Sequence, residues 1–154
     1  MIHDKSIVVG ACDWDHPQWR KTFYPEDLPE DWRLSYYANE FSAVLVPQEK
    51  WQSEEADFEQ WAEDVPEGFR FYFLSDDLSV DDVLIKRQLG DAFAGFVATA
   101  GNEQVVLIDF ADKNLREWKD WLLKTKCHVV FLVGDELSVK SVLDFQSLLE
   151  LMGL

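Results

Sequence analysis

The sequence predicts an α/β fold in which about five strand–helix units build a mainly parallel sheet. Three observations support this prediction. Short apolar runs rich in Val, Ile and Phe recur along the chain, amphipathic helical patterns alternate with them, and the length of 154 residues suits one domain. Strands that alternate with helices are joined by right-handed crossovers and lie parallel to one another. We therefore expect a single domain that spans residues 1–154.

The predicted strands are continuous apolar runs, which are typical of strands covered on both faces. In chain order they are Ser6–Ala11, Ala43–Val46, Phe69–Leu74, Val105–Phe110 and His128–Val133. Each is short and rich in β-branched or aromatic residues, so we expect all of them to lie inside the fold.

The predicted helices occupy the segments between these strands, where apolar residues recur at helical spacing. In chain order they are Trp32–Phe41, Ala56–Val65, Val80–Phe93, Leu115–Leu123 and Val139–Met152. The stretch Cys12–Asp31 shows neither pattern. An irregular stretch of this length in a compact domain is usually functional or holds a short element of its own.

Two architectures fit this alternation. One is a curled sequential sheet, a partial TIM-like (β/α) barrel. The other is an open five-stranded α/β sandwich of the doubly wound kind, which binds ligands where the strand order reverses. The residues at the end of the first strand, Gly10-Ala11-Cys12-Asp13, do not form a glycine-rich phosphate loop. Nucleotide binding in the doubly wound manner is therefore not supported.

The charge of the chain is strongly negative. Lys and Arg number 14 against 30 Asp and Glu, which gives a formal net charge of −16. Such a field repels nucleic-acid phosphates and anionic bilayers, so we expect neither as a partner. No apolar run approaches the ~18 residues of a membrane span. The acidity is explained most simply by solubility. Alternatively, it serves to bind a divalent cation or a basic partner protein.

The cysteine content suggests a reducing compartment. Cys12 and Cys127 are the two cysteines of the chain, too few for a secreted disulfide scaffold. The first residues, Met1–Lys5, lack the features of a signal peptide. We therefore expect a cytoplasmic protein with two free thiols.

The long irregular stretch carries a spaced motif. Gly10, Trp14, Trp19 and the triplet Phe23-Tyr24-Pro25 fit the pattern G-x-x-x-W-x-x-x-x-W-x-x-x-F-Y-P, and Trp32–Ala38 and Pro66–Phe71 extend the match. In these residues the chain resembles the DUF72 (YecE-like) family over about residues 7–75. The resemblance implies a TIM-like barrel of uncertain biochemical role. Because family members are longer, it also implies a shortened barrel that keeps about the first five units.

The chain departs from the family pattern at three strand ends. The resemblance implies a carboxylate where Leu45 stands, a lysine where Leu74 stands, and a polar run where Val130–Val133 is wholly apolar. A hydrocarbon side chain cannot replace a charged catalytic group. These departures favour a non-catalytic binding or interaction module.

An enzyme that acts on a small anionic or phosphorylated compound is the alternative function. Its catalytic candidates are Asp13, His16 and Asp109, with His16 as a general base. Asp109 interrupts an apolar run, which is costly for a carboxylate unless it has a partner or faces solvent. Asp13, Asp76 and Asp109 follow different strands and could together bind a divalent metal, which is the one cofactor that the sequence suggests. Alternatively, Asp76 caps a helix.

The candidate ligand-binding residues are largely aromatic. Trp14, Trp19 and Tyr24 lie in one loop, where they could line the base of a ligand pocket or close the end of the barrel. Arg20 in the same loop could bind an anion or stack on an aromatic ring. With Asp76 they complete the set. A partial barrel also leaves open sheet edges, expected at the first strand or its neighbours and at the fifth strand. A homodimer or a basic protein partner would cover them.

Overall fold

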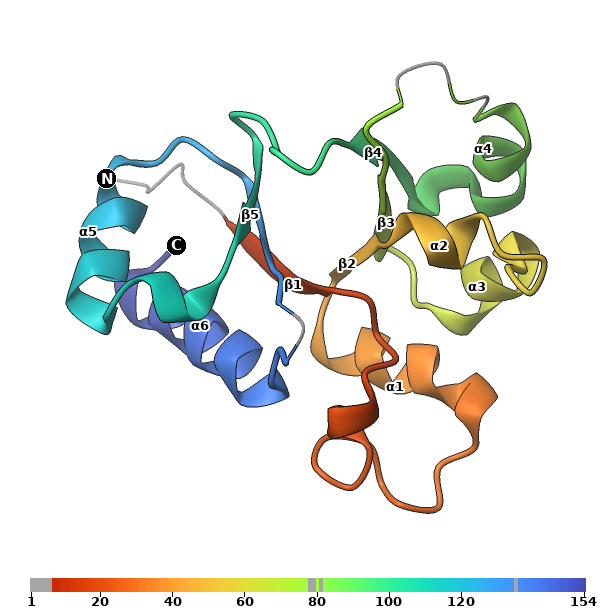
Figure 1. Ribbon diagram of the computed structural model, residues 1–154, viewed down its shortest axis with the longest axis horizontal. Helices are drawn as coiled ribbons and strands as arrows, with labels where there is room; N and C mark the ends of the chain where they lie inside the picture. The colour runs from red at the N-terminus through yellow and green to blue at the C-terminus, as the bar shows by residue number, and fades with distance from the viewer. Residues whose placement is uncertain (1–6, 78–79, 81, 135) are drawn as a thin grey trace.

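Six parallel strands form one sheet in the computed structural model, which describes residues 7–77, 80, 82–134 and 136–154 (Figure 1). The strand order is β4-β3-β2-β1-β6-β5. The strands are β1 (Val8–Cys12), β2 (Ala43–Val46), β3 (Arg70–Leu74), β4 (Phe93–Val97), β5 (Val105–Ile108) and β6 (Val129–Leu132). Five of them lie within two residues of the predicted bounds. Residues Met1–Lys5, used above to argue against a signal peptide, fall outside the described ranges.

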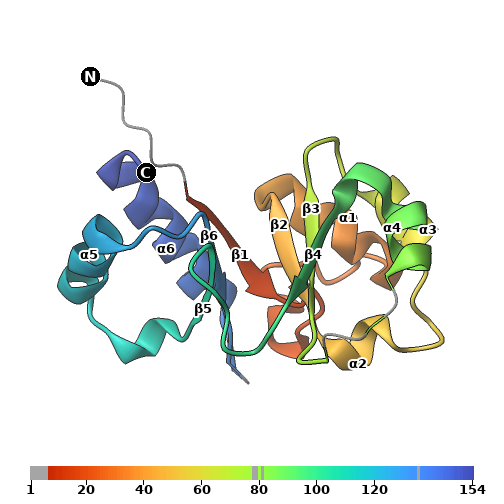
Figure 2. The same cartoon turned by 90° about the horizontal axis from the view of Figure 1, so that it is seen from above.

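Six helices accompany the strands in the described part of the chain. They are α1 (Arg33–Glu40), α2 (Gln48–Trp51), α3 (Phe58–Asp64), α4 (Val83–Leu89), α5 (Leu115–Lys124) and α6 (Val139–Met152). Helices α5 and α6 flank β5, β6 and β1, whereas α1, α3 and α4 flank the other half of the sheet (Figures 1 and 2). The irregular stretch Cys12–Asp31 holds short 3-10 turns, among them Pro17–Trp19.

Strand β4 was missed because the predicted helix Val80–Phe93 was drawn too long. Helix α4 ends at Leu89, and Gly90 follows with φ +60°, a left-handed conformation that glycine adopts readily. The chain then enters β4, whose sequence FAGFV contains a small residue and a glycine in place of a continuous apolar run. No helix follows β4 before β5, so the fold has the five expected strand–helix units plus one strand without a helix.

The two faces of the sheet decide between the two architectures. One face packs against helices, and its core joins Val9, Val44 and Phe71 to helical residues such as Tyr37 and Phe145. The other face is lined by strand residues: Ala43, Leu45, Val97, Val105, Val129 and Phe131. A doubly wound sheet carries helices on both faces. The one-sided arrangement confirms the partial (β/α) barrel.

The sheet curves around its strand-lined face. Tyr72 of β3 and Phe131 of β6 have ring centroids 5.3 Å apart, although two strands lie between them. In a flat sheet their strands would be about 14 Å apart. The side chains therefore meet across a concave surface, as they do inside a barrel.

The open edges of the sheet are not where the sequence analysis expected them. Strand β1 is central, paired with β2 on one side and with β6 on the other, and the edges are β4 and β5. In a closed sequential barrel the last strand pairs with the first. Because β6 takes that place, the barrel is interrupted between β4 and β5 and is not simply cut short after its fifth unit.

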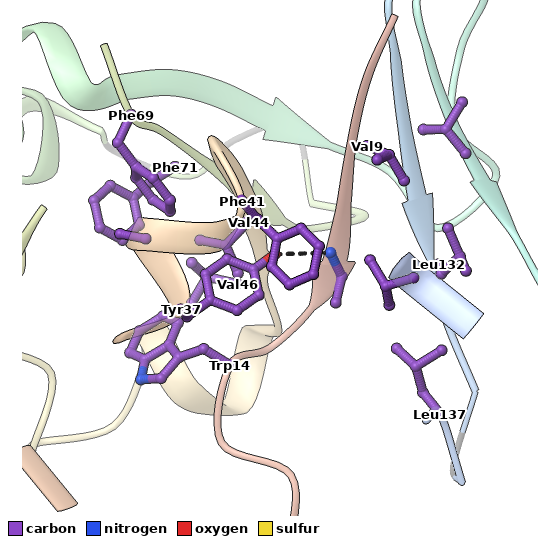
Figure 3. Packing of buried hydrophobic residues seen from close by; sticks show 14 of the residues in the cluster. Val9, Trp14, Tyr37, Phe41, Val44, Val46, Phe69, Phe71, Leu132 and Leu137 are labelled. Carbon is purple, nitrogen blue, oxygen red and sulfur yellow. Dashed lines mark hydrogen bonds between the residues drawn. The ribbon is translucent and has the colours of Figure 1, made fainter. Parts of the chain in front are cut away.

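Tyr37 of α1 ties the first two strands together from within the core, where it lies beside Phe41, Val44 and Val46 (Figure 3). Its hydroxyl accepts a hydrogen bond from the Ala11 amide at 2.9 Å and donates one to the Ala43 carbonyl at 2.7 Å. Burial raises the pKa of this hydroxyl, so it stays protonated and able to donate. The side chain thus bridges β1 and β2 where their direct pairing has not yet begun.

The described residues contain no helix that is both long and apolar enough to cross a membrane.

Candidate binding site

A pocket of about 700 Å³ opens beside the carboxyl ends of β1 and β2, the end of the sheet where (β/α) barrels carry their sites. Its walls come from the loop after β1, the start of α1, α2 and α3. Eight acidic residues line it: Asp13, Asp15, Glu30, Asp31, Glu49, Glu55, Asp57 and Asp64. Lys50 is the one base among these lining residues, all of which belong to the described part of the chain. The pocket therefore favours a positively charged ligand.

Two tryptophans form the apolar part of this acidic pocket. Trp14 meets Trp61 of α3 edge to face, with centroids 5.0 Å apart and an interplanar angle of 87°. Trp61 stacks in turn on Phe71 of β3 at 6.1 Å. Because both rings rest on the core, they are rigid surfaces for a ligand.

Lys50 places its ammonium group between a ring and a carboxylate of this pocket. Its Nζ lies 4.4 Å from the centroid of Trp14 and 3.1 Å from Oδ1 of Asp13. Helix α2 holds Lys50 there because the neighbouring Trp51 is buried and donates its indole N–H to the Leu74 carbonyl. The arrangement combines a cation–π contact with an ion pair.

The backbone of the chain fixes Asp13 independently of Lys50. Asp13 has φ +70°, a left-handed conformation that aspartate tolerates better than most residues. Its Oδ1 accepts hydrogen bonds from the amides of Trp14 at 2.7 Å and Asp15 at 3.1 Å. The carboxylate is thus oriented by the turn that begins at the end of β1.

Asp15 and Arg20 form an ion-pair group at the side of the pocket. Asp15 pairs with Arg33 at 2.8 Å and with Arg20 at 3.4 Å. Arg20, the candidate for anion binding, is half exposed and lies beside a carboxylate. Its charge is therefore partly compensated by the chain itself.

The structure does not bring the three catalytic candidates together. Asp13 lies in the pocket, whereas the His16 ring donates through Nε2 to the Cys12 carbonyl at 2.7 Å and packs 4.4 Å from Trp19. Asp109 is exposed just after β5 and accepts from the Ala111 amide at 3.0 Å, which caps a short 3-10 helix. Exposure and capping explain why a carboxylate can follow this apolar strand.

Asp76 also has a local role. It accepts two hydrogen bonds from Thr99, at 2.7 Å from the amide and at 2.8 Å from the hydroxyl. These bonds lower the pKa of Asp76, with the amide contributing most. Across the described ranges, no group of three or more His, Cys, Asp or Glu side chains has a metal-binding arrangement.

Of the aromatic candidates, Trp14 alone lines the acidic pocket. Trp19 is fully buried and donates its indole N–H to the Leu137 carbonyl at 2.8 Å. Tyr24 is buried as well, and its hydroxyl donates to the Trp14 carbonyl. Trp19 and Tyr24 are therefore parts of the core, and Tyr24 also holds the backbone of Trp14.

A family model described as "Protein of unknown function DUF72" matches residues 8–102, more than half of the chain. The chain belongs to the DUF72 family. No curated protein matches it. A solved structure of a DUF72 family protein from Thermotoga maritima aligns with 15% identity and a TM-score of 0.43, over 97% of this chain and 63% of that one. The chain thus spans less than two thirds of the length of that relative.

In this DUF72 member the concave face of the sheet is apolar. Leu45, one of the departures from the family pattern, is fully buried there beside Phe131, and Leu74 packs against the same cluster. Cys12 also faces this cluster. Burial, followed by the charges of Asp13 and Glu49, raises the pKa of the Cys12 thiol to about 12. The thiol is therefore protonated at neutral pH and a poor nucleophile.

Sequence reasoning missed much of the pocket. Asp57, Trp61 and Asp64 follow at spacings of four and three residues, which places them on one face of α3. That spacing was present in the sequence, but the helix prediction rested on the apolar residues of the segment and did not include the two aspartates. Glu49 and Lys50 belong to α2, a helix of four residues too short to show a periodic pattern.

Proposed function

We propose that this DUF72 member is a non-catalytic binding module whose acidic pocket takes a lysine-containing basic segment of a partner protein. One observation carries the proposal: eight acidic side chains surround a tryptophan pair on which an ammonium group already rests. Carboxylates and an indole face are the groups that bind an organic cation.

The chemistry of the strand ends supports binding rather than turnover. Leu45, Leu74 and Phe131 offer no proton donor or acceptor on the concave face. His16 and Asp109 are each engaged in local hydrogen bonds. The competing function, an enzyme for a small anionic compound, would have to draw its substrate toward a strongly acidic pocket.

The spread of charge supports an extended partner. The acidic residues come from the β1 loop, the 3-10 turn before α1, α2, the segment between α2 and α3, and α3 itself. A peptide with several basic side chains can satisfy such a distribution. The net charge of −16 would also accelerate its association at low salt. Both cysteines are free thiols, which supports a reducing cytoplasmic setting for this encounter.

Calorimetric titration with a capped peptide of alternating lysine and glycine tests the proposal. We expect binding that weakens when salt rises from about 50 mM to about 300 mM, and no binding of the matching glutamate peptide. The variant Asp57→Asn/Asp64→Asn should bind several-fold more weakly, because two carboxylates of the pocket are lost. Asparagine at position 57 can still cap α3, so the helix should be preserved.

The matched control is Asp91→Asn/Asp112→Asn, which removes two exposed carboxylates that do not line the pocket. Equal weakening by both pairs would mean that the peptide responds only to net charge, and the site would be rejected. Tighter binding of spermidine than of the peptide would identify a small polyamine as the occupant and contradict the protein partner.

A further inference from the structure

We propose that Lys50 is a tethered ammonium group that occupies the position of the ligand's own ammonium and must leave it when the ligand binds. This inference rests on the proposed function of the pocket. In the free protein, Lys50 fills the ammonium position of the pocket itself, a state that we call self-occupied. The ligand then carries a primary ammonium on an aliphatic stem, as a lysine side chain does.

The Lys50 ammonium already lies where we expect the ammonium of a ligand to bind. Three lysines in the described part of the chain lie over aromatic rings: Lys50 at 4.4 Å, Lys113 over Trp118 at 4.9 Å and Lys86 over Phe93 at 5.9 Å. Lys50 alone among them lines the acidic pocket, and its Nζ is also 3.1 Å from a carboxylate oxygen. The structure therefore already contains an ammonium bound in the way a ligand would be bound.

The position that Lys50 occupies does not depend on Lys50. Asp13 is held by the amides of Trp14 and Asp15. Trp14 is held by the Tyr24 hydroxyl on its carbonyl and by the edge contact with Trp61. When the lysine head moves away, the carboxylate and the ring remain in place. A preformed site of this kind can accept a second ammonium without paying for reorganisation.

One lysine leaves most of the pocket's charge uncompensated. In the residues that the structure describes, Glu49, Asp57 and Asp64 make no ion pair, and Lys50 pairs with Asp13 alone. The pocket is thus still attractive to a cation when Lys50 is in place. A ligand with several ammonium groups can first bind the carboxylates that make no ion pair and then displace Lys50 from Trp14.

Displacement lowers the observed affinity, because only the fraction of molecules in which Lys50 is withdrawn offers the full site. Replacing Lys50 by glutamine should therefore tighten binding of the lysine–glycine peptide by roughly two- to fivefold, the range expected for one exposed cation–π contact. Lys50→Met, which removes the charge but keeps an unbranched apolar side chain, should do the same and serves as a second variant.

Lys113→Gln is the matched control. It removes an equal charge and a cation–π contact of similar geometry, but at Trp118, outside the pocket. We expect its affinity for the peptide to rise by less than that of Lys50→Gln. The Trp14 indole resonance in NMR spectra should shift in Lys50→Gln, and the shift should be largely reversed when peptide is added, because the ligand ammonium replaces the lost one.

The outcomes separate the two proposals. Tighter binding by Lys50→Gln and Lys50→Met than by Lys113→Gln supports self-occupation. Unchanged or weaker binding by both Lys50 variants, with the wild type still binding, overturns the self-occupation alone. If wild type and all variants fail to bind while their circular dichroism is native, the proposed function itself fails.

Discussion

At the scale of single residues, two buried polar groups organise the loop after β1. Tyr37 supplies the hydrogen bonds that Ala11 and Ala43 cannot give each other directly. Tyr24 holds the Trp14 carbonyl, and Asp13 closes the turn beside it. Tyr37 thus joins β1 to β2 at the start of this loop, whereas Tyr24 and Asp13 hold the backbone of Trp14 at the pocket.

Removing the Tyr37 hydroxyl should destabilise the fold. In Tyr37→Phe the buried Ala11 amide and Ala43 carbonyl each lose a hydrogen-bond partner. Such a loss lowers the free energy of unfolding by about 1–3 kcal/mol. Urea unfolding measures the loss as a lower midpoint. Tyr36→Phe is the control, since the Tyr36 hydroxyl makes no hydrogen bond within the described residues and its ring is only partly buried. Equal effects of the two substitutions would argue against the bridging role.

At the scale of elements, the short strand β4 depends on its neighbours. It follows no predicted strand pattern and pairs with β3 alone, with a register shift between Phe71 and Tyr72. Asp76 and Thr99 connect the loops that follow β3 and β4. The connection links the two strands at their carboxyl ends, beside the edge of the sheet.

The Asp76–Thr99 connection should make stability depend on pH. The pKa of Asp76 is lowered in the folded state, so its ionised form contributes stability fully above the unfolded-state pKa, and this contribution is lost as pH falls through the lower folded-state value. The difference in unfolding midpoint between wild type and Asp76→Asn should therefore be largest at neutral pH and shrink in acid. Asp91→Asn, an exposed carboxylate with the same charge change, should show a smaller difference at neutral pH. If the difference in unfolding midpoint between wild type and Asp76→Asn stayed constant with pH, the stabilising role of the ionised Asp76 would be contradicted.

At the scale of the whole molecule, the interrupted barrel packs much of its concave face with its own strand residues. Leu45, Val105 and Phe131 meet on the concave face, and Tyr72 reaches Phe131 across it. The sequence left open whether a second copy completes the barrel. Leu45 and Phe131 are fully buried without a second copy, and a pocket of about 240 Å³ remains between Tyr72, Val97 and Val105.

We expect the chain to be a monomer of about its own mass of 17.9 kDa. The edge strands β4 and β5 have five and four residues, and short edges resist pairing with another chain. A net charge of −16 on each copy adds mutual repulsion. Light scattering across a dilution series at low salt measures the mass. A stable dimer at every concentration would show that the open edges are used for self-association.

The sequence by itself determined the alternation of strands and helices, because continuous apolar runs and helical spacing are local signals. Helix α6 and strand β2 match their predicted bounds, and the motif from Gly10 to Pro25 was sufficient to indicate the family. The apolar replacements Leu45 and Leu74 were also legible in the sequence. The sequence also indicated Trp14 and Asp13 as site residues.

Only the tertiary structure decided which strands are neighbours and which charges meet. The pairing of β6 with β1 joins segments more than a hundred residues apart, and no local pattern encodes it. The acidic pocket likewise gathers residues from the β1 loop, α2 and α3. The contact of the Lys50 ammonium with the Trp14 ring depends on the position of α2, which the buried Trp51 anchors. Such contacts follow from packing over long chain separations, which is why composition revealed the negative charge but not the place where it is concentrated.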